Sequence, residues 1–127
     1  MIQSYFAALG TLLLGDLVWI GLIAGPQYRR HLGPLMVEQP RKFAAGLFYL
    51  SYPAGIAYFA VLPGLAASSL TATLLDGAAL GALAYATFSF TNWAVLRAWT
   101  WSLVVADIAW GAVITALSAA AGHWLAT

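Results

Sequence analysis

The chain has no cysteine and very few charged residues. None of its 127 residues is a cysteine, which excludes disulfides, thiolate nucleophiles and cysteine-ligated metals. Only 7% of the residues are charged, against about 25% in an average soluble domain. The net charge of +1 comes without a basic stripe, so no nucleic-acid partner is indicated. We expect no bound metal, because the topology below puts His31 and His123 at opposite membrane faces, where they cannot share one. The identity of any cofactor is open, and we expect none.

Long apolar stretches are what the sequence has in abundance. Hydrophobic residues make up 63% of the chain, and a membrane-spanning helix needs roughly 20 of them in succession. Four such stretches cover about residues 4–25, 43–63, 71–93 and 100–122, and we expect the first to end at Pro26. The pattern predicts an all-α integral membrane four-helix bundle with up-down topology, as a single domain over residues 1–127. The N-terminus lacks a basic start, so we expect the first helix to be retained rather than cleaved as a signal peptide.

The basic residues predict how the bundle is oriented. Arg29, Arg30, Arg41 and Lys42 fall between the first two helices, and Arg97 falls between the last two. Lysine and arginine concentrate on cytoplasmic loops. We therefore expect a multi-pass protein of a bacterial inner membrane, with loops 26–42 and 94–99 cytoplasmic and both termini periplasmic.

Two aspartates interrupt apolar helices. Ionisable groups inside a bilayer are expensive, and they usually face the interior of a bundle. Asp16 in the first helix and Asp107 in the fourth are expected at similar depth, and a tryptophan follows each by three residues, Trp19 and Trp110. This spacing puts each aspartate and its tryptophan on one helix face. A neutral aspartate in such a place can donate a hydrogen bond or carry a proton.

Further polar residues are expected at the same depth. Ser89 and Asn92 continue a stripe that begins at Tyr85 on the third helix, while Tyr49 and Tyr52 precede Pro53 on the second. If the four faces converge, they form a polar pocket in the cytoplasmic half. The same groups also fit a purely structural role, in which they bond across helices and fix the packing.

Three classes of function remain open. A module that binds or transports a small molecule, lipid or cation would use Asp16, Trp19, Tyr49, Tyr52, Ser89, Asn92, Asp107 and Trp110. A non-enzymatic accessory or assembly subunit would dock a membrane-protein partner, or a second copy, through Gly77 and Gly81. The spacing of these glycines suits close helix contact either inside the bundle or between protomers. A lipid-modifying enzyme is less favoured, because no nucleophile stands beside a base.

The remaining features concern helix ends. Arg29 and Arg30 are candidates for contact with anionic lipid headgroups, or serve topology alone. Asp76 follows Thr73 by three residues, which predicts a capping box in the first turn of the third helix. Trp99, Trp101 and Trp124 lie near helix ends, and we expect all three at the membrane interfaces as aromatic anchors.

Five short stretches resemble one bacterial membrane-protein family. They are residues 28–36 (YRRHLGPLM), 48–52 (FYLSY), 59–63 (FAVLP), 84–92 (AYATFSFTN) and 107–111 (DIAWG). They resemble the family catalogued as domain of unknown function 2177, which implies a four-helix inner-membrane protein without an established activity. Asp16, Asn92 and Asp107 match the family pattern. Relatives typically carry an aspartate where this chain has Ser89, which puts in doubt any proton or cation site that needs it.

Overall fold

A computed structural model describes residues 1–36 and 41–127, and every element in this part of the chain is helical. The elements are α1 (Ile2–Trp19), η1 (Ile20–Ala24), α2 (Gly25–Leu32), η2 (Gly33–Leu35), α3 (Lys42–Ile56), η3 (Ala57–Val61), α4 (Leu62–Ala66), α5 (Leu70–Val95) and α6 (Trp101–Ala126). They join into four helices long and apolar enough to cross a membrane, which confirms the all-α four-helix bundle. Residues 37–40 of the expected loop 26–42 lie outside the described residues.

The first helix does not end at Pro26, as the sequence suggested, but runs on through α2. Proline has no N–H and normally breaks an α-helix. Here the chain forms a π turn, η1, just before the proline, and the N–H of Gly25 bonds to the carbonyl of Ile20, five residues back. Glycine is required at this position, because a Cβ on Gly25 would collide with that carbonyl oxygen.

A second π turn, η3, allows the second membrane-spanning helix to continue through a proline in the same way. Leu62, the residue just before Pro63, donates its N–H to the carbonyl of Ala57, five residues back in η3. Short π segments of this kind absorb a local break in the hydrogen-bond ladder. The helix therefore continues past the expected end at Pro63 as α4.

Helix α5 begins earlier than expected, so the predicted capping box of Thr73 and Asp76 is wrong. Its N-cap is Ser69, whose Oγ accepts a hydrogen bond of 3.0 Å from the N–H of Ala72. Asp76 consequently lies beyond the first turn and is exposed. Thr73 is fully buried and points to another helix, where its hydroxyl meets His123 Nδ1 at 2.7 Å.

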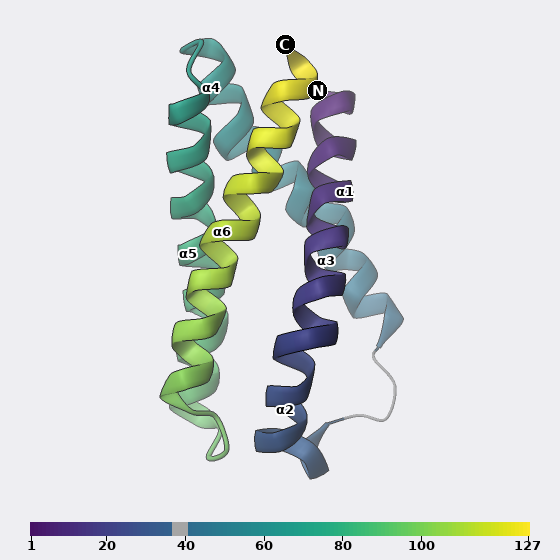
Figure 1. The fold of residues 1–127 in the computed structure, drawn as a ribbon, viewed down its shortest axis with the longest axis vertical. Coiled ribbons are helices and arrows are strands. Elements are labelled where there is room, and N and C mark those ends of the chain that lie inside the picture. The colour runs from purple at the N-terminus through teal and green to yellow at the C-terminus, as the bar shows by residue number, and fades with distance from the viewer. Residues whose placement is uncertain (37–40) are drawn as a thin grey trace.

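Helix α6 lies at the centre of the packing, between α5 and α1 (Figure 1). The second spanning helix crosses behind it at a slant. Its first half, α3, packs on α1, whereas η3 and α4 pack on α5. The two chain termini lie together at one end of the bundle (Figure 1). We call this the terminal end. We call the opposite end the basic end, because α2 ends there with Arg29 and Arg30, and Arg97 lies there in the turn between α5 and α6.

Glycines on α5 bring it close to α6. A Cβ on Gly77 would meet the α6 backbone at Ala116, 3.0 Å from its Cα, and a Cβ on Gly81 would collide with the carbonyl of Gly111. Both glycines are buried. Of the two contacts that the glycine spacing allowed, the structure shows the one inside the bundle, between α5 and α6.

Candidate functional site

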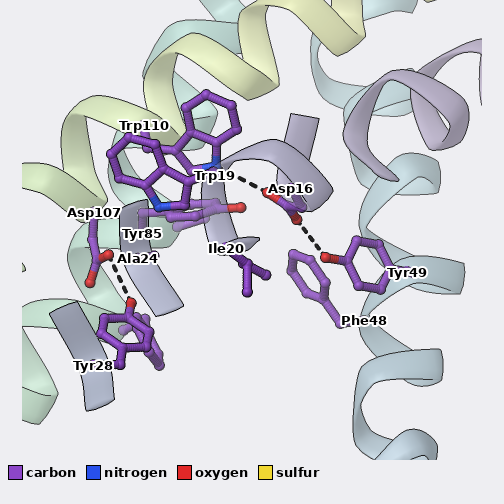
Figure 2. A pocket seen from close by; sticks show the side chains of 12 residues that line it. Asp16, Trp19, Ile20, Ala24, Tyr28, Phe48, Tyr49, Tyr85, Asp107 and Trp110 are labelled. Atoms are coloured by element: carbon purple, nitrogen blue, oxygen red, sulfur yellow. Dashed lines mark hydrogen bonds between the residues drawn. The ribbon is translucent and has the colours of Figure 1, made fainter. Parts of the chain in front are cut away.

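A cavity of about 400 Å³ lies between the helices where α3 and α5 stand apart (Figure 2). Its walls come from the first spanning helix and from α3, α5 and α6. The lining residues are Asp16, Trp19, Ile20, Ala24, Tyr28, Phe48, Tyr49, Ala84, Tyr85, Phe88, Asp107 and Trp110. Both intramembrane aspartates therefore face one space, as the matched depth in the sequence suggested.

Asp16 ties α1 to two other helices. Its Oδ2 accepts a hydrogen bond of 2.5 Å from the hydroxyl of Tyr49 on α3, and its Oδ1 accepts one of 3.0 Å from the indole N–H of Trp110 on α6. Both carboxylate oxygens thus have a donor from the protein itself. Only 7% of the Asp16 surface remains exposed.

Asp107 forms the corresponding link at the other side of the cavity. Its Oδ1 accepts a hydrogen bond of 2.9 Å from Tyr28 on α2, and its Oδ2 accepts one of 3.0 Å from Ser89 on α5. The Ser89 oxygen in turn accepts a bond of 3.0 Å from the indole N–H of Trp99. Trp99 is only 5% exposed, so the expectation that it anchors the chain at the interface is wrong.

The two tryptophans that follow the aspartates meet each other across the bundle. Trp19 and Trp110 stack with ring centroids 4.8 Å apart and planes 3° from parallel. Figure 2 shows this stack between Asp16 on one side and Asp107 on the other. Trp110 also donates its indole N–H to Asp16, so its hydrogen bond goes to the aspartate of α1 and not to Asp107 on its own helix.

The cavity presents an aromatic and apolar surface more than a polar one. Asp107 is only 4% exposed, and like Asp16 it has a donor on each oxygen. The open walls are instead aromatic rings and aliphatic side chains. Phe48 on α3 and Phe88 on α5 are 38% and 50% exposed, at the lipid-facing margin. The expected polar pocket is, in the structure, an apolar cavity whose carboxylates are covered by hydrogen bonds.

Not every residue predicted for the site reaches it. Tyr52 turns toward the terminal end and shares a hydrogen bond of 2.7 Å with Thr115 on α6. Asn92 lies in the last turn of α5, away from the cavity lining. Arg29 and Arg30 are exposed in the last turn of α2 and do not line the cavity either.

Tyr28 was missed as a site residue because the first helix was expected to stop at Pro26. Asp16, Ile20, Ala24 and Tyr28 follow one another at intervals of four, and all four line the cavity. That interval marks one face of a continuous helix. A reading that carried the helix through the proline would have found this face.

A second, shallower hollow of about 310 Å³ lies on the outside of α1 and α3. It is lined by Leu13, Asp16, Leu17, Ile20, Gly21 and Tyr49. Asp16, Ile20 and Tyr49 also line the larger cavity, so these three side chains separate the two hollows. In the described part of the chain, no three acidic or histidine side chains are grouped so that they could hold a metal ion.

The fold and cavity describe a multi-pass membrane protein, and comparison with known families agrees. The model of the family described as predicted membrane protein (DUF2177) matches residues 1–124. The chain belongs to this family, which confirms the resemblance seen in the sequence. Searches of curated proteins and of solved structures returned no match.

Proposed function

We propose that this protein binds the apolar chain of a membrane lipid in the cavity between α3 and α5. The observation that carries the proposal is an aromatic cavity of about 400 Å³ whose two carboxylates already have donors from the protein. Its volume lies within the range of about 300–1,000 Å³ that is usual for ligand sites. An apolar chain would cover the exposed rings without needing the carboxylates as partners.

The basic end supports a headgroup beside this chain. Tyr28 lines the cavity, and the exposed Arg29 and Arg30 follow it on α2. Arginines next to a membrane surface attract anionic headgroups. We therefore assign Arg29 and Arg30 to the headgroup and the aromatic cavity to the tail of one amphiphile.

The other functions have less support. A cation would compete with Tyr28, Tyr49, Ser89 and Trp110 for carboxylate oxygens that these residues already occupy. A docking role through Gly77 and Gly81 conflicts with their burial against α6. An enzyme acting by acid–base catalysis would need Asp16 or Asp107 to reach a reacting group, and both are at least nine-tenths covered.

We further propose that the protein lies in a bacterial inner membrane with the basic end in the cytoplasm. All five basic residues lie in or beside the loops that follow the first and third spanning helices, and the positive-inside rule favours the cytoplasm for such loops. The absence of cysteine permits a direct test with single introduced cysteines. In intact cells, an impermeant thiol reagent should label Thr127→Cys and not Leu96→Cys. The reverse pattern would overturn the orientation.

Filling the cavity tests the lipid proposal. Ala84 lines the cavity on α5, whereas Ala79 on the same helix is exposed. Native mass spectrometry would measure retention of added palmitate and phosphatidylglycerol by the purified protein. Ala84→Phe should lose the bound lipid, while the matched control Ala79→Phe should keep it. Equal retention in both variants, or none by the wild type, would refute a cavity for lipid chains.

A further inference from the structure

One tyrosine hydroxyl of the cavity has no partner among the described residues. Tyr28 donates its hydroxyl to Asp107, and Tyr49 donates its hydroxyl to Asp16. Tyr85 lines the same cavity, but its hydroxyl forms no hydrogen bond with the part of the chain that the structure describes. A buried tyrosine usually finds a partner for its hydroxyl. The Tyr85 hydroxyl is therefore the one that a ligand can use.

This hydroxyl is accessible from the cavity. Among the described residues that are not exposed, only Ser118 has an enclosed side-chain oxygen or nitrogen without a hydrogen-bond partner. Because the Tyr85 hydroxyl also has no partner, it is accessible rather than enclosed. Figure 2 shows the Tyr85 ring beside the Trp19–Trp110 stack, with its hydroxyl end toward the middle of the cavity.

Helix packing fixes the position of the Tyr85 ring. A Cβ on Gly111 would collide with Cγ and Cδ1 of this ring, so the ring lies directly on the α6 backbone. The ring of Tyr52 stands beside it, with centroids 6.4 Å apart and planes 59° apart. Ligand cavities obtain specificity from a few polar groups held in such fixed positions.

The Tyr85 ring lies deeper than the region assigned to the headgroup. Tyr28, next to Arg29, bonds to Asp107 on α6. Tyr85 packs on Gly111, one turn of α6 farther from the basic end. Four residues of an α-helix correspond to about 6 Å. The ligand group that meets Tyr85 therefore follows the headgroup, where the chain of a lipid begins.

The charges of the cavity indicate a neutral ligand group at this depth. Asp16 and Asp107 both line the cavity, and no lysine, arginine or histidine is among the described residues that line it. An unpaired charge is costly in an apolar site, and two nearby carboxylates would repel an anion. The acceptor that suits the Tyr85 hydroxyl is thus a neutral oxygen.

We propose that the ligand is an acyl ester and that Tyr85 donates a hydrogen bond to its ester carbonyl. This carbonyl is a neutral acceptor, and in a glycerolipid it lies between the headgroup and the acyl chain. Arg29 and Arg30 would hold the headgroup, Tyr85 the carbonyl, and the aromatic cavity the chain. The inference rests on the proposed binding of a lipid chain and names the class of lipid.

Two lipids that differ only in the carbonyl test this assignment. Palmitoyl-lysophosphatidylglycerol contains an ester, whereas its hexadecyl ether analogue has the same headgroup and chain length without the carbonyl. Native mass spectrometry of the full-length protein would measure the competition of both lipids in one mixture. Wild type should prefer the ester by about 2–10-fold, which corresponds to one hydrogen bond.

Matched tyrosine variants provide the comparison. Tyr85→Phe keeps the ring and breaks no hydrogen bond between described residues, and it should bind both lipids equally. Tyr52→Phe removes the neighbouring hydroxyl, which bonds to Thr115, and should keep the preference for the ester. A preference that persists in Tyr85→Phe, or equal binding of both lipids by wild type, would overturn the ester assignment and leave the lipid cavity standing. Binding of neither lipid by wild type would overturn both.

Discussion

The two ends of this bundle are built from the same helices but pack differently. Toward the terminal end most of the close contacts involve small residues. Ala8, Ala60 and Ala119 pack with Ile56 and Val61 in one cluster, and Gly77 and Gly81 lie against α6. Toward the basic end the contacts are large aromatic rings joined by hydrogen bonds. Lipid gives helices no hydrophobic reason to associate, so side-chain size sets how closely they approach. Small residues close one half, and large ones hold the other half open around a cavity.

The closed half should be the more sensitive to added volume. In Gly81→Ala the new Cβ would collide with the Gly111 carbonyl, and backbone on a packed helix cannot move aside cheaply. We expect the free energy of unfolding in detergent to fall by about 1–3 kcal/mol, as for other overpacked cores. The control is Gly46→Ala on α3, where nothing lies within 4 Å of the new Cβ. Equal stability of both variants would contradict the comparison between the two halves.

The open half should depend instead on its carboxylate links. Asp107→Leu removes the acceptor for Tyr28 and Ser89, which hold α2 and α5 to α6. Hydrogen bonds between membrane helices are individually modest, so we expect a loss of about 1–2 kcal/mol in unfolding free energy. Thermal unfolding would measure it beside Asp76→Leu, which removes an exposed carboxylate from α5 and should cost nothing. A loss of the same size in the control would mean that Asp107 contributes only as a charge.

The sequence alone predicted the features that follow from composition and periodicity. The four helices came from apolar length, and the inward direction of Asp16 and Asp107 came from the cost of charge in lipid. Hydrogen-bond partners on other helices could not be predicted, because periodicity indicates the helix face of a residue but not which residue of the next helix contacts it. Trp110 accordingly bonds to Asp16 and not to its neighbour Asp107. Asn92 lies on the expected helix, but near the end of α5 and outside the cavity.

The sequence also failed to predict that the first helix continues through Pro26, and this continuation affects the site directly. A proline after a long apolar run ordinarily ends a helix, and only the π turn η1 shows that this one continues. Because the helix continues, Tyr28 reaches Asp107 and closes one side of the cavity. The rule that proline ends a helix therefore failed at Pro26, between the cavity residues Ala24 and Tyr28.

The smallest expected effect concerns the boundary between the cavity and the outer hollow. Tyr49→Phe removes one hydrogen bond to Asp16 while keeping the ring, so unfolding free energy should fall by only about 0.6 kcal/mol. Tyr49, Asp16 and Ile20 separate the two hollows. The same change should therefore clearly speed the exchange of palmitate, although it lowers the unfolding free energy only slightly. Stopped-flow release of a fluorescent fatty acid would measure this beside Tyr58→Phe, an exposed tyrosine of η3. Unchanged exchange would mean that lipid reaches the cavity between α3 and α5, past Phe48 and Phe88, and that the Asp16–Tyr49 bond only fixes α3 to α1.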